Sequence, residues 1–141
     1  MIFETYTSKE EGFFGFYQKL FIETFGEWKP HRPPDFIYIV RDGESIGWAE
    51  GLIRKPWELF MLYGGVPKNQ HGRIINVKGY QALLEKLHND GWKSLMTEIE
   101  NTNKAMLKLA ITSGFLINGA RVASNGTVVV TLYKTQKENT L

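Results

Sequence analysis

The stretch from Glu58 to Leu87 constrains the fold of this chain more than any other. It begins with an apolar run over residues 59–63, which is typical of a buried strand and stops at Gly64-Gly65. A polar loop follows, and then a helix with apolar residues at helical spacing, namely Val77, Tyr80, Leu83, Leu84 and Leu87. This order directs the free N–H groups and the positive dipole end of the helix into the loop. Such a loop is suited to bind phosphate.

Composition excludes several classes of protein. The chain has 141 residues, of which 43% are hydrophobic, and this predicts one folded domain over residues 1–135 with a frayed tail at 136–141. The net charge of +2 is spread along the chain, so we expect no nucleic-acid partner. There is no cysteine, and the histidines are far apart, so we expect no metal: His31, His71 and His88. We find no membrane-spanning run and no signal peptide, which favours a soluble cytoplasmic protein.

The N-terminal part predicts a strand over residues 2–7 and then a helix. Ser8 and Glu11 have the spacing of a capping box at the helix start. An aromatic and aliphatic stripe at spacings of three and four follows, which we interpret as core, and Gly26 ends it: Phe13, Phe14, Tyr17, Leu20, Phe21 and Phe25. Three prolines make the next connection, 27–35, a semi-rigid loop.

The remaining segments predict a mixed sheet. Residues 36–40 and 45–53 form strands around the Asp42-Gly43 turn. Residues 92–99 form a strand parallel to 59–63, because a helix that ends before Gly91 lies between them. A helix over 104–112 and two strands joined by a two-residue turn at Asn125-Gly126 complete the chain. The predicted class is α/β (α+β), with a mostly antiparallel sheet of about seven strands, a central parallel pair and three to four helices.

The segment from Asn103 to Phe115 resembles a family motif. It matches Asn-x-x-Ala-Ile-x-Leu-Tyr-x-Lys-x-Gly-Phe at the Asn, at the apolar helix positions and at the closing Gly-Phe. This motif is typical of the GCN5-related N-acetyltransferase (GNAT) superfamily, whose order of strands and helices also resembles the one predicted here. The resemblance covers nearly the whole chain.

A second segment, Val66 to Ile75, resembles the acyl-CoA pyrophosphate loop of that family, Val-x-Pro followed by Arg/Gln-x-x-Gly-x-Gly/Ala. The match is partial. If Gln70 takes the Arg/Gln place, Arg73 and Ile75 fill the two glycine places; if Gly72 takes the first glycine place, Asn69 replaces the Arg/Gln. Glycine is favoured there because the backbone must approach the pyrophosphate closely.

The resemblance implies that acetyl-CoA is a co-substrate held between two parting strands. The backbone of the first strand would pair with the pantetheine amides, as an added strand does. Gly64-Gly65 would permit a bulge there that directs a backbone N–H to the thioester carbonyl. The residues expected to bind acetyl-CoA are Leu62, Gly64, Val66, Gln70, His71, Gly72, Arg73, Ile74 and Asn103.

Transfer to an amine also needs a base and an acid. In this family the acid is frequently the Tyr of the Leu-Tyr pair, and Ala110 stands in that place here. Tyr80 and Tyr63 are the remaining phenols near the expected site, and we take Tyr80 as the candidate acid. The carboxylates that could act as the base stand on strands or at strand ends, with Glu58 and Glu98 as the first candidates: Glu50, Glu58, Glu98 and Glu100.

Two functions follow from the resemblance. The first is an acetyl-CoA-dependent N-acetyltransferase that acts on a primary amine of a small molecule or protein. The second is a non-catalytic GNAT-like binding or structural protein with weakened or lost CoA binding, such as small phage-encoded proteins of this fold. The loops 28–35 and 123–127 would form the acceptor side. Trp28, Tyr38 and Trp48 suit an aromatic acceptor pocket, a core or the face of a homodimer.

Overall fold

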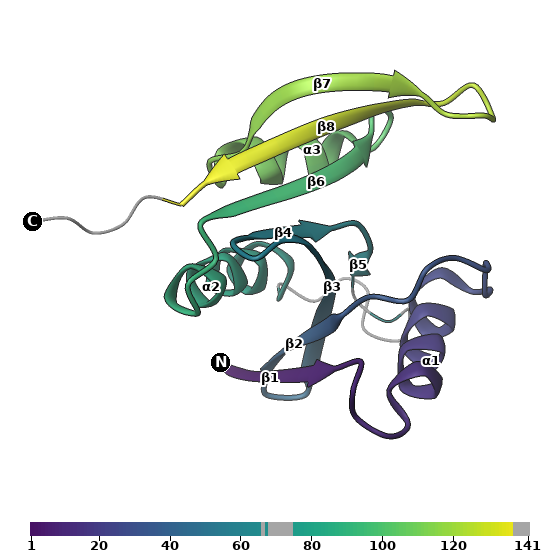
Figure 1. The fold of residues 1–141 in the computed structure, drawn as a ribbon, viewed down its shortest axis with the longest axis vertical. Coiled ribbons are helices and arrows are strands. Elements are labelled where there is room, and N and C mark those ends of the chain that lie inside the picture. The colour runs from purple at the N-terminus through teal and green to yellow at the C-terminus, as the bar shows by residue number, and fades with distance from the viewer. Residues whose placement is uncertain (66, 68–74, 137–141) are drawn as a thin grey trace, which may run out of the picture. The chain divides into compact units, whose positions relative to one another are not determined.

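The computed structural model describes residues 1–65, 67 and 75–136. Figure 1 shows the helices and strands that these residues form. In chain order they are β1 (Ile2–Thr7), α1 (Phe13–Phe25), β2 (Phe36–Asp42), β3 (Ser45–Lys55), β4 (Glu58–Met61), β5 (Gly64–Gly65), α2 (Ile75–Asn89), β6 (Ser94–Glu100), α3 (Lys104–Thr112), β7 (Leu116–Val122) and β8 (Val128–Thr135).

The strand order is β1-β2-β3-β4-β6-β8-β7, with the short β5 paired to β3. The pairing of β4 with β6 is parallel, and the other ladders described here are antiparallel. The predicted α+β class and the central parallel pair are confirmed. The chain divides into two compact units, Met1–Leu52 with Tyr63–Leu84 and Ile53–Leu62 with Glu85–Leu141, so that β3 and α2 contribute to both.

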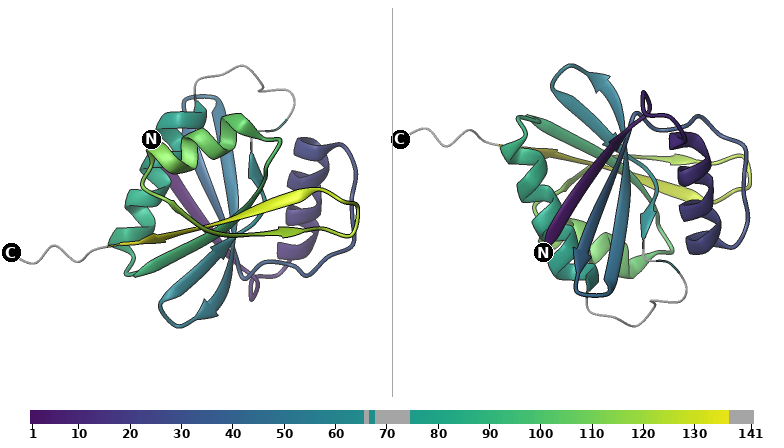
Figure 2. Two further views of the ribbon diagram at one scale, coloured as in Figure 1. Left: turned by 90° about the horizontal axis from the view of Figure 1, so that it is seen from above. Right: turned by 90° about the horizontal axis from the view of Figure 1, so that it is seen from below.

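The first unit is built from β1, β2, β5, α1 and parts of β3 and α2. The right-hand view of Figure 2 shows β1, β2 and β3 side by side. Four members of the predicted stripe of α1 are core, because they pack with residues of β2 and β3 in one buried cluster: Phe13, Tyr17, Leu20, Phe21, Ile37, Ile39 and Trp48. The prediction is wrong for Phe14 and Phe25, which are 45% and 42% exposed. The α1 stripe is rich in aromatic residues, and their rings meet edge to face at the centre of this cluster.

The predicted capping box at Ser8 and Glu11 is wrong. The helix begins later, at Phe13, and its N-cap is Gly12, whose left-handed backbone with φ of 79° makes no side-chain cap. The carboxylate that caps a backbone group here is Glu10, which accepts from the Thr7 N–H at 2.6 Å, while the Ser8 N–H is donated to the Asp35 carbonyl. A turn over these residues therefore uses the groups that a capping box would need.

The second unit is built from β4, β6, β8, β7, α3 and the ends of β3 and α2. Figure 1 shows β6, β8 and β7 as neighbouring arrows, in agreement with their two antiparallel ladders. Leu59, Leu95 and Leu132 come from three strands of this unit, and each is fully buried. From Leu95 onward, buried residues of β6 alternate with less buried ones, as in a strand with one face toward a core.

The hairpin between β7 and β8 differs in one respect from its prediction. The Ala123 N–H is donated to the Thr127 carbonyl, which closes a loop of three residues rather than two. Gly126 takes the left-handed conformation, with φ of 85°, at the end of that loop. This is the three-residue hairpin in which a left-handed residue follows a tight turn, and Asn-Gly serves it as well as the shorter form.

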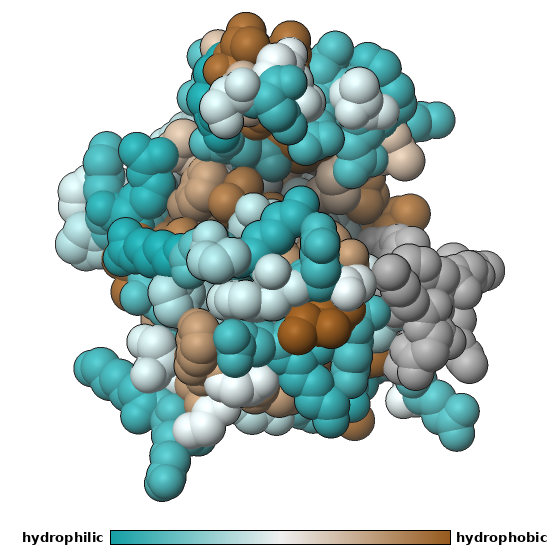
Figure 3. All heavy atoms as spheres, turned by 90° about the vertical axis from the view of Figure 1, so that its right-hand side faces the viewer, coloured by the Kyte–Doolittle hydropathy of each residue, from teal (hydrophilic) through white to brown (hydrophobic). Residues whose placement is uncertain are grey.

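The strand β7 exposes apolar side chains. Leu116 is 73% exposed and Val122 is 70% exposed, although strands of a sheet normally bury one face. Figure 3 shows brown atoms at the top, where the β7–β8 hairpin faces the viewer. None of the helices in the described part of the chain is long and apolar enough to cross a membrane.

Candidate functional site

The junction between β4 and β5 is the first part of the site. The parallel ladder of β4 with β6 ends at the Met61 and Thr97 pair, where the Thr97 hydroxyl donates to the Met61 carbonyl at 2.6 Å. The strand β6 itself continues to Glu100. After Met61 the chain leaves the strand at Leu62 and Tyr63, and then pairs with β3 through Gly64 and Gly65. The chain therefore leaves the β4–β6 ladder beside the two glycines.

Gly64 is required by the pairing with β3. A Cβ atom at this position would lie 2.7 Å from the Trp48 carbonyl oxygen and 3.1 Å from the Ala49 Cα atom. Both are backbone atoms of the neighbouring strand, so neither can swing away as a flexible side chain does. The close approach of two backbones explains the glycine without any ligand.

Glu50 holds the junction from the β3 side. Its N–H is donated to the Tyr63 carbonyl at 2.9 Å, and its carboxylate accepts from the Tyr63 N–H at 3.3 Å. In a regular antiparallel pair the Tyr63 N–H would be donated to a main-chain carbonyl of the neighbouring strand. Here the Glu50 carboxylate takes the place of that carbonyl. The Glu50 side chain is buried, with 1% exposed, and burial raises the pKa of its carboxyl group.

A hydrogen-bonded chain extends from Glu50 to the loop after α1. The Tyr17 hydroxyl lies 2.5 Å from Glu50 Oε2 and 2.6 Å from His31 Nε2, and His31 Nδ1 lies 2.6 Å from the Lys29 carbonyl oxygen. Burial, followed by the bond to Glu50, raises the pKa of Tyr17. We call Tyr17, His31 and Glu50 the buried triad.

Aromatic rings surround the imidazole of the buried triad. The ring centroids of Trp28, Tyr63 and Phe21 lie 5.0, 5.0 and 5.1 Å from that of His31. His31 and Trp28 are half-buried, whereas Tyr17 is completely buried. The loop that was expected to form the acceptor side is thus fixed to the core through a histidine stacked among rings.

Two of the predicted catalytic carboxylates are already paired. Glu58 is buried, accepts from the Ser94 hydroxyl at 3.1 Å and lies 3.8 Å from Arg54 Nε. Glu98 accepts two bonds from the Arg121 guanidinium, with the shorter at 2.5 Å. Glu58 pairs with Ser94 at the start of the ladder, and Ser94 precedes Glu98 by four residues on β6. The Cα atoms of Glu58 and Glu98 are therefore offset by roughly 13 Å along the strand direction. The structure does not bring them together.

Tyr80, the candidate acid, lies on α2. Its side chain is half-buried, and burial raises the pKa of its phenol. A raised pKa makes the phenol harder to ionise. Tyr80 lies in the first unit and the two carboxylates lie in the second, and each is placed only within its own unit.

The family-like segment around α3 has a structural explanation. Asn103 is the N-cap, and its Oδ1 accepts from the Met106 N–H at 3.2 Å. At the other end the Gly114 N–H is donated to Ile111 and the Phe115 N–H to Ala110, with Gly114 at φ of 102°. These two bonds form a Schellman motif, in which Gly and a following apolar residue close a helix. Ala110 is fully buried and carries no hydroxyl group.

Most of the remaining residues that were expected to bind acetyl-CoA lie outside the part of the chain that the structure describes. Leu62 is half-buried between β4 and β5, and the first described residue of α2 is Ile75. The others lie outside the described residues: Val66, Gln70, His71, Gly72, Arg73 and Ile74. Among the residues that the structure does describe, no three His, Cys, Asp or Glu side chains come together as metal ligands.

Sequence reasoning missed the buried triad. Glu50 was a candidate base, but Tyr17 belonged to an apolar stripe and His31 to a proline-rich loop. His31 and Glu50 lie 14 and 33 positions after Tyr17 along the chain. The one available signal was a carboxylate in the middle of an otherwise apolar strand pair, because such a group needs a buried partner.

Solved structures match the chain over nearly its whole length. A chimera built on the spermidine N-acetyltransferase SpeG from Vibrio cholerae has a TM-score of 0.74 and 13% identity, covering 96% of this chain and 97% of its own. The ribosomal-protein-S18-alanine N-acetyltransferase from Escherichia coli has a TM-score of 0.69 and 14% identity, covering 99% of each. A GNAT family acetyltransferase from Elizabethkingia anophelis with acetyl-CoA bound has a TM-score of 0.63 and 13% identity, covering 95% and 97%.

The chain has the GNAT fold. No protein-family sequence model matches the chain, and no curated protein sequence matches it. At 13 to 14% identity the likeness concerns the fold alone. That fold includes the mixed, mostly antiparallel sheet and the central parallel pair of β4 and β6.

Proposed function

We propose that this protein is an acetyl-CoA-dependent N-acetyltransferase that acts on a primary amine of a small molecule or protein. The observation that carries the proposal is the junction after Met61, where the chain leaves the β4–β6 ladder within a GNAT fold. Beyond that point, β6 residues up to Glu100 have no β4 partner in the described part of the ladder. A strand edge with unpaired amides can bind an extended ligand by adding it as a strand.

The chain offers residues for both ends of acetyl-CoA. The backbone of Leu62, Gly64 and Val66 would bind the pantetheine amides, and Asn103 would add a side-chain contact. The loop before α2 would bind the pyrophosphate through main-chain N–H groups, with Arg73 adding a charge-assisted bond. Loop residues in this role are Gln70, His71, Gly72, Arg73 and Ile74. Acetyl-CoA would supply an acetyl group carried on a thioester.

The residues of the chain would then assist the transfer of that acetyl group. A backbone N–H at the junction would stabilise the negative charge that develops on the carbonyl oxygen. A carboxylate would accept the proton that the amine loses, and Glu98 lies one residue beyond the end of the ladder, whereas Glu58 lies at its start. Tyr80 would return a proton to the departing sulfur.

The first experiment is calorimetric titration with acetyl-CoA and with CoA, and NADH serves as a control that has a pyrophosphate but no pantetheine. We expect micromolar binding of both CoA forms, about −8 kcal/mol, and none of the control. Release of free thiol with a panel of amines then tests transfer. The absence of heat, together with no thermal shift at millimolar ligand, would remove the proposal.

A non-catalytic binding or structural protein is the second candidate function. The fully buried Ala110 and the exposed apolar residues of β7 favour it, because the first removes the usual acid and the second suits a protein partner. The two functions separate in the same experiment. Binding of CoA with no thiol release from any amine, at any pH between 6 and 9 (roughly the range where amines and phenols begin to titrate), would favour the second.

A further inference from the structure

The Tyr63 peptide is held on both sides by one residue. The Glu50 main chain donates to its carbonyl, and the Glu50 carboxylate accepts from its N–H. We propose that Glu50 is a positioning residue, which fixes the Tyr63 peptide at the junction where acyl-CoA would pair. This inference rests on the proposed function for its consequence, although the contact itself can be tested without any ligand.

The positions of the acceptors determine how many protons the buried triad holds. His31 Nδ1 faces the Lys29 carbonyl, which can only accept, so Nδ1 carries a hydrogen. The Tyr17 hydroxyl lies within hydrogen-bond distance of both His31 Nε2 and Glu50 Oε2, yet it has one hydrogen. A second hydrogen must lie on Nε2 or on Oε2. The triad therefore holds one proton more than a neutral tyrosine, a neutral histidine and an ionised carboxylate would hold together.

Both places for that proton leave every bond made. With the proton on His31, the imidazolium donates to Tyr17 and Tyr17 donates to the carboxylate. With the proton on Glu50, the carboxylic acid donates to Tyr17 and Tyr17 donates to neutral His31. Loss of the proton would leave two acceptors competing for one hydrogen, which a buried group avoids. The proton thus couples the loop that contains His31 to the carboxylate that holds Tyr63.

The proton count predicts that the conservative variant Glu50→Gln keeps the hydrogen bonds of Glu50 to Tyr17 and to the Tyr63 N–H. The amide NH2 can donate to Tyr17, as a protonated carboxyl does, and the amide oxygen can still accept from the Tyr63 N–H. Glu50→Leu has a similar volume but offers no acceptor. We expect Tyr63 amide hydrogen exchange to keep its protection in Glu50→Gln and to accelerate about tenfold in Glu50→Leu. The amide of Ile39, in the same core, is the internal reference.

Matched substitutions at Glu4 serve as controls, because Glu4 is a carboxylate of the same unit that bonds a tyrosine but lies on the surface. Glu4→Gln and Glu4→Leu should leave Tyr63 exchange unchanged. For the site, CoA affinity should fall about tenfold in Glu50→Leu and stay within about twofold in Glu50→Gln and in both Glu4 variants. If Glu50 acted only through general stability, the Gln side chain at position 50 would not restore Tyr63 protection and CoA affinity while Leu fails to do so.

The wild-type protein provides a test if Glu50→Leu does not fold. The groups that face Glu50 are Tyr17 from α1, His31 from the loop and Tyr63 from the junction. The Tyr63 amide shift should follow the titration of the Glu50 carboxyl carbon in NMR spectra. An amide that does not titrate with Glu50, or equal Tyr63 exchange in the Gln and Leu variants, would overturn the inference. Absence of CoA binding by the wild type would overturn the proposed function and leave the positioning contact to these measurements.

Discussion

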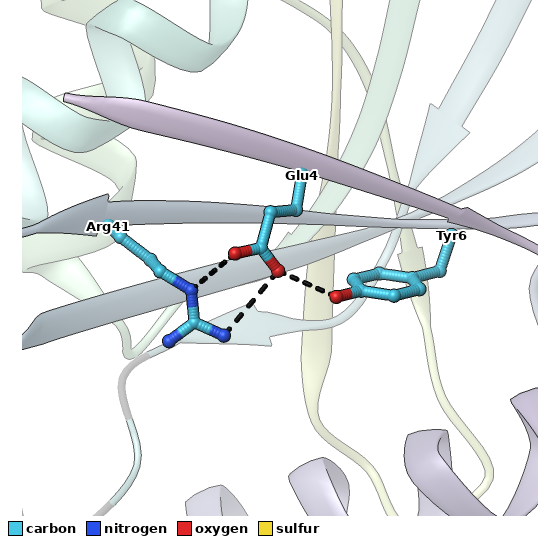
Figure 4. Close-up of polar contacts among 3 residues, drawn as sticks. All are labelled: Glu4, Tyr6 and Arg41. Carbon is cyan, nitrogen blue, oxygen red and sulfur yellow. Dashed lines mark hydrogen bonds and ion pairs between the residues drawn. The ribbon is translucent and has the colours of Figure 1, made fainter.

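The first unit contains two clusters with the same chemistry in different surroundings. In the surface cluster, Glu4 accepts from Arg41 Nε at 2.6 Å and from the Tyr6 hydroxyl at 2.6 Å, as Figure 4 shows. In the buried triad, Glu50 Oε2 lies 2.5 Å from the Tyr17 hydroxyl, which also contacts His31. Each cluster joins a carboxylate, a tyrosine and a basic side chain. The pKa of the carboxyl group is nevertheless lowered at Glu4 and raised at Glu50.

The difference lies in which contribution dominates the pKa. At Glu4 the bond from Arg41 is the largest cause, then the bond from Tyr6, and together they hold the pKa below its usual range. At Glu50 burial is the largest cause and raises the pKa, although Tyr17, the Tyr63 N–H and His31 all lower it. A tyrosine and a basic side chain thus favour the ionised form of Glu4 at the surface. Similar partners do not outweigh the effect of burial on Glu50 in the core.

The largest expected effect is on stability after loss of the buried acceptor. Glu50→Leu should lower the free energy of unfolding by about 2 kcal/mol, because the buried Tyr17 hydroxyl and the Tyr63 N–H both lose the carboxylate as a partner. Glu4→Leu should lower it by about 0.5 kcal/mol, since exposed ion pairs contribute little. Urea denaturation at pH 7 measures both. Equal losses at the two positions would show that burial does not separate the clusters.

Removal of each tyrosine hydroxyl should have the next largest effect. Tyr17→Phe leaves Glu50 and His31 without their common partner and should cost about 1.5 kcal/mol. Tyr6→Phe should cost less than about 0.5 kcal/mol, because water replaces the hydroxyl at the surface. Guanidinium unfolding midpoints would compare the two variants. A Tyr6 variant as unstable as the Tyr17 variant would contradict the contrast.

The two carboxylates should give stability opposite dependences on pH. Because the pKa of Glu50 is raised, its contribution is present below its usual value of 4.5 and is lost as the pH rises through the folded pKa. Because the pKa of Glu4 is lowered, its contribution is present above 4.5 and is lost as the pH falls through the folded pKa. The free energy of unfolding, measured by urea denaturation at pH values from about 3 to about 8, should report both dependences. Glu50→Gln should remove the loss of stability at rising pH, and Glu4→Gln should remove the loss at falling pH.

Salt should produce the smallest effect. The coupling of Glu4 to Arg41, from a double-mutant cycle, should fall from about 0.5 kcal/mol to near zero at 1 M NaCl, where the Debye length is about 3 Å. The coupling of Glu50 to Tyr17 should not change, because no ions enter the core. A salt-sensitive coupling in the buried triad would indicate that solvent reaches it.

Local sequence patterns predicted most of the fold. The stripe of α1, the glycines after α1, α2 and α3, and the parallel relation of β4 and β6 all follow from spacing between near neighbours. Two of the local errors also have local causes: Gly12 delays the start of α1, and Ser124 joins the turn at Asn125-Gly126. Periodicity indicates which face is buried but not where each helix or turn begins.

The site was less predictable, because its contacts join distant segments. The Asn103 and Gly114 positions were recognised from their separation, and the structure shows caps at both. The buried triad brings together a helix, a loop and a strand, and no pattern in any one of them identifies the others. Glu58 and Glu98 were chosen as isolated carboxylates, whereas their partners Ser94 and Arg121 come from neighbouring strands.

Gly64 has a consequence for how relatives of this chain would diverge. A Cβ atom there would meet the Trp48 carbonyl oxygen at 2.7 Å whether or not any substrate is bound. Selection for folding alone would therefore keep the glycine in a lineage that had lost acetyl transfer. Residues that serve only the ligand would drift in such a lineage. A glycine retained here through evolution would thus be a record of strand packing, and it should not be counted as a sign of surviving activity.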